Sequence, residues 1–282
     1  MTKLLSLIRR SIHMDLAFMA TRNSVADKID FIIKKYFLLI KHFFYPFIIT
    51  KSKIEVFSQD FYYESNLGLT LYQVSLIHHA RLFLDLDMGN QNVILFDIGA
   101  NVGCFSLVFK KVFPNSQIYD FEPVPDVFKC LTLNVKGIDG VKAENFGLSD
   151  APGTFKFLYD SKNTEMGMLS DAGNITVQIE TLDAYVERKN IPYISFLKID
   201  TETFEKHVLL GARKTLARTK YILLEVNYES SNINYTISDL MSTLSSENYN
   251  FQLLKIVNFL DKNIEDAKIL DFLLVNRKYE ED

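Results

Sequence analysis

The chain contains no tryptophan and only two cysteines, Cys104 and Cys130, among its 282 residues. Two cysteines that match no metal-ligand spacing exclude a framework of several disulfides, and they favour a reducing compartment with buried thiols. No internal repeat or low-complexity tract is present, and 48% apolar with 23% charged residues is typical of a globular protein with a sizeable core. The N-terminus lacks a clean apolar run followed by a small-residue cleavage site, so we expect no secretory leader and a cytoplasmic protein.

Net positive charge is confined to the first segment of the chain. Residues 1–53 contain ten Lys or Arg and three Asp or Glu, a balance of +7, whereas the whole chain carries −4. The remaining residues therefore carry −11. An acidic body argues against nucleic acid as a partner, because phosphate contacts need clustered cations.

The basic N-terminal segment has a helical pattern over residues 1–50. Lysines interrupt the apolar run between Asp27 and Ile49 well before the ~20 residues that a membrane-spanning helix needs. Such a helix could lie on an anionic membrane surface, pack against the rest of the chain or join two subunits, and the sequence leaves these alternatives open. We assign residues 1–60 to a basic helical extension and residues 61–282 to a second domain.

In the second domain, apolar segments alternate with helical patterns, as in parallel βαβ units. We expect central strands at residues 93–96, 116–121, 141–148, 194–199 and 221–227, an inserted hairpin at 154–159 and 175–181, and final strands at 251–257 and 269–276. No helix-length connection separates the final two strands, so they should pair antiparallel. The prediction is an α/β, Rossmann-like, mostly parallel sheet that ends in an antiparallel hairpin.

The stretch around which the rest is arranged runs from Val93 to Gly103, V-I-L-F-D-I-G-A-N-V-G. A strand buried on both faces, a glycine turn and a helix N-terminus together predict a site for a nucleotide-like ligand. Gly99 would let the backbone approach that ligand, and Gly103 would let the helix from Asn101 to Phe113 pack close to the strand. The spacing is GxxxG and not GxGxxG, so alone it would indicate no more than a tight turn.

Acidic residues at the ends of the next two predicted strands strengthen this interpretation. Glu122 ends the second strand about 20 residues after the glycine turn, where it can accept hydrogen bonds from ribose hydroxyls. The third predicted strand is followed by Ser149 and Asp150, and Asp150 could either bind an adenine amine or form part of a turn. Together these residues predict an adenosine-containing cofactor.

A second acidic group follows the fourth predicted strand. Asp200, Glu202 and Glu205 fall within six residues at the carboxyl end of that strand, and open α/β sheets bind ligands in this crevice. Glu205 lies in the first turn of a helix, where the helix dipole alone accounts for an acid. Asp200 and Glu202 are therefore the predicted general bases.

Several short motifs in this chain resemble the FkbM family of S-adenosylmethionine-dependent methyltransferases. They are F-D-I-G-A-N-V-G (96–103), F-E-P (121–123), G-L-S-D-A-P-G (147–153), E-T-L-D (180–183) and L-K-I-D-T-E-T-F-E (197–205). Each motif is weak alone, but the ordered series at similar spacing is specific, and it covers roughly residues 90–230.

The resemblance implies a seven-stranded class I methyltransferase sheet with S-adenosylmethionine as its cofactor. The implied binding residues are Asp97, Gly99, Asn101 and Gly103, with Glu122 on the ribose. The implied reaction is O-methylation of a sugar, glycan, glycolipid or secondary-metabolite hydroxyl. A hydroxyl nucleophile needs no metal for this displacement, so we expect none, and a Mg²⁺ ion bound by carboxylates stays an open alternative.

One residue departs from the family pattern. The family commonly has glycine where this chain has Thr203, and the resemblance implies added bulk beside the cofactor crevice. Two alternatives stay open at this stage: a nicotinamide-dependent oxidoreductase, because the same turn and acid serve dinucleotides, and a non-catalytic domain that binds cofactor. The GxxxG spacing and the closing antiparallel hairpin argue against the oxidoreductase.

Overall fold

The computed structural model describes residues 15–16, 18–19, 24–44, 52–56, 59–63, 72–73, 75–84, 86–88, 92–159, 168–169, 172–227, 235–257 and 269–279. The segment 160–174, which joins the two predicted strands of the inserted hairpin, falls largely outside the described residues.

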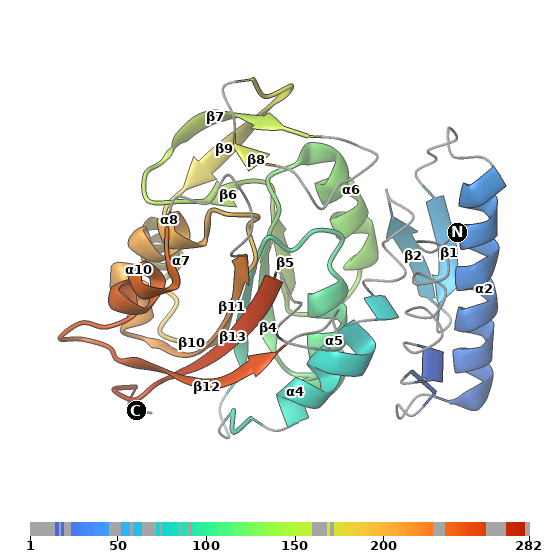
Figure 1. Ribbon diagram of the computed structural model, residues 1–282, viewed down its shortest axis with the longest axis horizontal. Coiled ribbons are helices and arrows are strands. Elements are labelled where there is room, and N and C mark those ends of the chain that lie inside the picture. The colour runs from blue at the N-terminus through green and yellow to red at the C-terminus, as the bar shows by residue number, and fades with distance from the viewer. Residues whose placement is uncertain are drawn as a thin grey trace.

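A seven-stranded sheet forms the centre of the molecule, in the order β12-β13-β11-β10-β3-β4-β5 (Figure 1). Its strands are β3 (Ile94–Ile98), β4 (Gln117–Phe121), β5 (Val141–Glu144), β10 (Ile194–Ile199), β11 (Thr219–Asn227), β12 (Phe251–Val257) and β13 (Ile269–Asn276). Five neighbouring strands are parallel, and β13 runs antiparallel to both β11 and β12. The predicted mostly parallel sheet with an antiparallel end is confirmed.

Helices cover both faces of this sheet, which explains why every residue of β3 and β10 is buried (Figure 1). One face carries α4 (Ala80–Leu84), α5 (Cys104–Val112) and α6 (Pro125–Asn134), and the other carries α7 (Leu182–Lys189), α8 (Glu205–Leu210), α9 (Arg213–Leu216) and α10 (Ile237–Thr243). Two apolar clusters fill the spaces between the helices and the sheet. The carboxyl ends of the parallel strands remain accessible at one edge.

The prediction of a single strand over residues 141–148 is wrong. It divides into β5 and β6 (Gly147–Leu148), and β6 joins a separate sheet of order β6-β9-β7-β8. The other members are β7 (Gly153–Leu158), β8 (Met168–Leu169) and β9 (Ile175–Glu180), and β7 pairs antiparallel with β9 as the hairpin prediction expected. Between β5 and β6, the side-chain amide of Asn145 donates to the backbone oxygen of Glu122 at 2.9 Å, which fixes the bend.

Two helices also differ from their predicted extents. Helix α5 begins at Cys104 and not at Asn101, because Asn101 and Gly103 both have positive φ angles, 50° and 87°. The apolar pattern after Glu205 predicts one helix that continues to about Arg218, but the structure interrupts this helix at Gly211. A Cβ at Gly211 would lie 2.0 Å from the backbone oxygen of Ser149, so this position requires a close backbone approach.

The N-terminal segment forms α2 (Val25–Phe44) and a hairpin of β1 (Ser52–Val56) and β2 (Gln59–Tyr63). The hairpin lies between α2 and the rest of the molecule (Figure 1). Asn134 of α6 fixes it there, because its side chain bonds both the backbone nitrogen and the backbone oxygen of Tyr62, at 2.6 and 2.8 Å. The predicted domain boundary at residue 60 falls within β2, and the two-domain division stays a prediction.

Candidate active site

A cavity of about 290 Å³ opens at the carboxyl ends of the central strands. It is near the lower end of the ~300–1,000 Å³ range of small-molecule sites. Its lining combines apolar side chains such as Ile98 and Phe105 with a few polar groups, among them Glu122, Asp200 and Glu225. This is the crevice where open α/β sheets bind ligands.

The glycine turn after β3 forms one wall of the cavity. The backbone nitrogens of Gly99 and Ala100 both donate to the Phe121 oxygen at 3.0 Å, which ties the turn to the end of β4. Gly99 has a φ of +79°, and a Cβ there would lie 1.8 Å from the backbone oxygen of Asp200. Glycine is therefore required both by the backbone conformation and by the contact with the end of β10.

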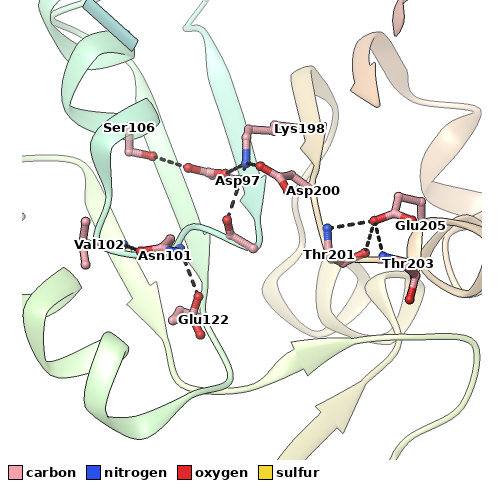
Figure 2. Close-up of polar contacts among 11 residues, drawn as sticks. Asp97, Asn101, Val102, Ser106, Glu122, Lys198, Asp200, Thr201, Thr203 and Glu205 are labelled. Atoms are coloured by element: carbon pink, nitrogen blue, oxygen red, sulfur yellow. Dashed lines mark hydrogen bonds and ion pairs between the residues drawn. The ribbon is translucent and has the colours of Figure 1, made fainter. Parts of the chain in front are cut away.

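Glu122, which directly follows β4, closes the same wall (Figure 2). Its carboxylate accepts from the backbone nitrogens of Asn101 at 3.0 Å and Val124 at 2.9 Å, and only 6% of the residue is exposed. Burial raises the pKa of Glu122 to about 7, although these two N–H groups favour the charged form. Each carboxylate oxygen can accept more than one hydrogen bond, so lone pairs stay available to a ligand.

Lys198 joins the glycine wall to the opposite, acidic wall (Figure 2). Its Nζ lies 3.2 Å from Asp97 Oδ1 and 2.9 Å from Asp200 Oδ2. Burial alone would lower the pKa of Lys198, but the charges of Asp200 and Asp97 outweigh burial and raise it. The ammonium therefore stays charged and fixes the ends of β3 and β10 relative to each other.

Behind Lys198, a buried polar group extends into the core. Ser106 Oγ donates to Asp120 at 2.5 Å and lies 3.3 Å from Asp97 Oδ2. Burial and the charge of Asp97 raise the pKa of Asp120 well above its ordinary value, so its neutral form is favoured. Our sequence interpretation missed this group, although Asp120 and Lys198 are charged residues inside otherwise apolar strands.

The acidic wall contains Asp200, Glu202 and Glu225, whose closest carboxylate oxygens lie within 4.8 Å of one another. Glu225 Oε2 is buried and has no hydrogen-bond partner within the described part of the chain. Burial and the charge of Asp200 raise its pKa well above the ordinary value. The same two causes raise the pKa of Asp271, which lies opposite Glu225 in the sheet, to about 8.

Such a trio of carboxylates has the ligand type that Mg²⁺ prefers. Among the acids, histidines and cysteines of the described residues, this trio lies close enough together to hold a cation. The expectation that the chain uses no metal stays a prediction.

Glu205, in contrast, organises the loop between β10 and α8. Its Oε1 accepts from the backbone nitrogens of Thr201 and Thr203 at 3.0 and 3.2 Å, and its Oε2 accepts from the Tyr235 hydroxyl. The residue is 1% exposed. Its position in the first turn of α8 agrees with the structural role that the helix dipole suggested.

Thr203 has a φ of +87° and Glu202 a φ of +51°, both unusual for residues other than glycine. Thr203 is buried, but it is not among the residues that line the cavity. The departure from glycine therefore places strain in the backbone of this loop. It does not put the threonine side chain in the cavity wall.

The cavity brings together part of the predicted site. Gly99, Asn101, Glu122, Asp200 and Glu202 line it. The other four predicted residues, Asp97, Gly103, Ser149 and Asp150, are not among the lining residues.

Gly103 was expected to bring its helix close to a strand, but a Cβ there would meet Leu131 of α6 at 2.8 Å, so the close packing is between two helices. Asp150 is exposed, accepts from Ser149 Oγ at 3.0 Å and lies 3.3 Å from His207 Nδ1. These contacts are those of a surface turn, one of the two roles considered for Asp150.

A sheet of this strand order, with a glycine turn after its first strand and a buried acid after its second, has the architecture of the class I methyltransferases. Its antiparallel β13 also excludes the wholly parallel dinucleotide fold of the oxidoreductase alternative. The model of the methyltransferase FkbM domain matches residues 97–253, more than half of the chain. The chain belongs to the FkbM methyltransferase family, and S-adenosylmethionine is its cofactor.

Three relatives illustrate the extent of the similarity. Methyltransferase sdnD of Sordaria araneosa is 35% identical over 102 residues, covering 32% of this chain and 39% of that protein. The 2-O-methyltransferase NoeI of Sinorhizobium fredii is 24% identical and covers 47% and 62% of the two chains. The 31-O-demethyl-FK506 methyltransferase FkbM of Streptomyces tacrolimicus is 24% identical, and the match covers 48% of this chain and 65% of that protein. The chain thus spans less than two thirds of the length of each relative.

Proposed function

We propose that this protein transfers the methyl group of S-adenosylmethionine to a hydroxyl of a sugar, glycan, glycolipid or secondary metabolite. The observation that carries the proposal is the cavity itself, which joins a glycine turn and a buried glutamate on one side to a cluster of carboxylates on the other. The first wall suits an adenosine cofactor and the second suits an acceptor that must lose a proton.

On the cofactor side, we assign the ribose to Glu122 and the approach of the ligand to the turn from Gly99 to Asn101. Two backbone N–H groups hold the Glu122 carboxylate in place, so its free lone pairs are oriented before a ligand arrives. Asp97 and Gly103 support this wall from behind, through Lys198 and through α6. Ser149 and Asp150 remain candidates for the adenine only as neighbours of the lining residue Leu148.

On the acceptor side, Asp200 and Glu202 are the proposed proton acceptors. When bound, S-adenosylmethionine supplies a methyl group that is already activated by its sulfonium charge. The protein then has to hold the hydroxyl oxygen in line, exclude water and take up the proton. The Asp200 carboxylate is fixed by Lys198 at 2.9 Å, which makes it suitable for positioning a hydroxyl.

Two relatives support a hydroxyl as the acceptor group. Their names describe a 2-O-methyltransferase and the methyltransferase of 31-O-demethyl-FK506. The acceptor of the present chain is a proposal by this similarity, because the matched segments cover only part of those proteins.

The proposal is tested by incubating the full chain with S-adenosylmethionine labelled in its methyl group and a panel of methyl glycosides. We expect label in an ether product with at least one sugar, and its loss in the Asp200→Ala or Glu202→Ala variant that still binds S-adenosylhomocysteine. Parallel reactions with Mg²⁺ and with EDTA show whether the acid trio needs a cation. Absence of an ether product with every sugar, in protein that binds S-adenosylhomocysteine, would contradict methylation of a sugar hydroxyl.

A further inference from the structure

Helix α2 exposes a continuous apolar stripe along its outer side. Val25, Ile29, Ile33 and Phe37 are 61%, 48%, 63% and 65% exposed. A spacing of four residues places all four on one face of the helix. Figure 1 shows α2 at the outer edge of the molecule, with the β1–β2 hairpin between it and the central sheet.

The opposite face of α2 contains the polar residues that an amphipathic helix normally turns outward. Lys35 is 3% exposed, and its Nζ donates to Asp15 at 2.5 Å and to Gln73 at 2.9 Å. Lys28 is also buried and donates to the backbone oxygen of Met19. The helix therefore satisfies its buried cations inside the protein and leaves its apolar stripe outside, which marks an interaction surface.

We propose that this apolar stripe of α2 lies on an anionic lipid surface. Residues 1–53 carry a balance of +7 and the rest of the chain −11. An anionic membrane would attract the first segment and repel the acidic body, so the protein would be oriented with α2 towards the lipid. An exposed apolar helix face within a chain segment of net positive charge is the combination that helices in the membrane interface use.

The described residues contain no helix long and apolar enough to cross a bilayer. The acidic residues beside the stripe repel an anionic lipid surface only weakly, because each has a partner within the protein. Asp30 is paired with Lys34 at 2.6 Å, and Asp27 accepts a hydrogen bond from Ser24. The stripe therefore fits a helix that lies flat in the interface.

A second copy of the chain fits the stripe less well. Pairing two copies through α2 would bring together two segments that each carry +7. The four stripe residues extend over about 18 Å of helix, whereas a stable interface uses roughly 800 Å² and 20–30 residues on each partner. Charge and size thus both favour the lipid surface.

The test is sedimentation of the full chain with vesicles of phosphatidylcholine mixed with phosphatidylserine and with vesicles of phosphatidylcholine alone. We expect binding to the mixed vesicles that decreases as salt is raised. The double variant Ile33→Glu, Phe37→Glu should bind them at least about tenfold more weakly, because it removes two side chains from the apolar contact. The matched control is Leu133→Glu, which replaces a residue of α6 that is 43% exposed and should leave binding unchanged.

Circular dichroism and binding of S-adenosylhomocysteine by every variant show that the fold and the cofactor site are intact. The same measurements separate lipid binding from the proposed methyl transfer, because lipid binding does not depend on methyl transfer. Absence of vesicle binding by the wild type, or equal binding by the double variant, would overturn the proposal. A wild-type dimer that the double variant dissociates, without vesicle binding, would assign the stripe to a second copy.

Discussion

The two walls of the cavity are built on different physical principles. The glycine wall, from Gly99 to Asn101 with Glu122, depends on shape: its positions are fixed by backbone hydrogen bonds and by the absence of a Cβ. The acidic wall depends on charge, because the carboxylates of Asp200, Glu202 and Glu225 lie close together and Asp200 is paired with the Lys198 ammonium. A wall fixed by shape suits an unchanging cofactor, and a wall fixed by charge suits proton transfer from an acceptor.

The largest effect should come from a methyl group added to the glycine wall. We expect Gly99→Ala to lower the free energy of unfolding by at least about 4 kcal/mol, because its Cβ would overlap the Asp200 backbone oxygen at 1.8 Å. Gly137→Ala is the matched control: its φ is also positive, +77°, but nothing lies within 4 Å of the added Cβ. Equal losses in urea unfolding would show that backbone conformation and not close contact makes Gly99 necessary.

The next effect removes the cation that joins the two walls. Lys198→Met should cost about 3 kcal/mol of stability, because Asp97 and Asp200 would lose their buried partner. Lys129→Met removes an exposed ion pair with Asp126, whose side chains are 66% and 47% exposed, and should cost less than ~1 kcal/mol. Urea unfolding measures both losses, and equal losses of stability in the two variants would contradict this prediction.

A third prediction concerns the titration of the glycine wall. Since the pKa of Glu122 is about 7, its carboxylate form grows as pH rises from 6 to 8, and affinity for S-adenosylhomocysteine should rise with it. Glu122→Gln should weaken binding at pH 8 by about 1–3 kcal/mol and should flatten the pH dependence. Calorimetric titrations across this range check both effects, and an unchanged slope in the variant would assign the titration to another group.

The same pKa shift has a consequence for folding. A carboxyl group whose pKa rises on folding binds its proton more tightly in the folded state, so it favours folding at low pH. That contribution is fully present below the ordinary value of 4.5 and is lost as pH rises through about 7. The ligand-binding effect has the opposite direction, which allows the two to be distinguished.

The smallest effect should be a gain in stability. Thr203→Gly should raise the free energy of unfolding by about 1 kcal/mol, because a φ of +87° is strained for threonine and not for glycine. Thr176→Gly, in strand β9 where φ is not positive, should instead destabilise the protein. Thermal unfolding of both variants decides this, and a loss of stability in Thr203→Gly would mean that the threonine side chain contributes more than the strain costs.

The sequence predicted the parallel core well because buried strands such as β3 and β10 are continuous apolar runs with clear ends. It failed where tertiary contacts decide the local structure. The bend at Asn145 and the interruption at Gly211 depend on bonds and close approaches to Glu122 and Ser149, which are distant along the chain. Local pattern carries no information about such contacts.

The site shows the same division. The positions of Gly99 and Glu122 in the cavity wall were predictable because they follow from a βα turn and a strand end. The partners of Lys198 were not, since only the folded sheet places Asp97, Asp120 and Asp200 around it. Glu225 could be recognised as an acid within an apolar strand, but its position beside Asp200 required the β10–β11 pairing.

The most direct test of the central claim is calorimetric titration of the purified full chain with S-adenosylhomocysteine at pH 8. We expect saturable binding at one site per chain, weakened by Glu122→Gln and unchanged by Asp126→Asn, a substitution on the exposed surface of α6. Absence of binding by protein that unfolds cooperatively would contradict the assignment of this cavity to the cofactor.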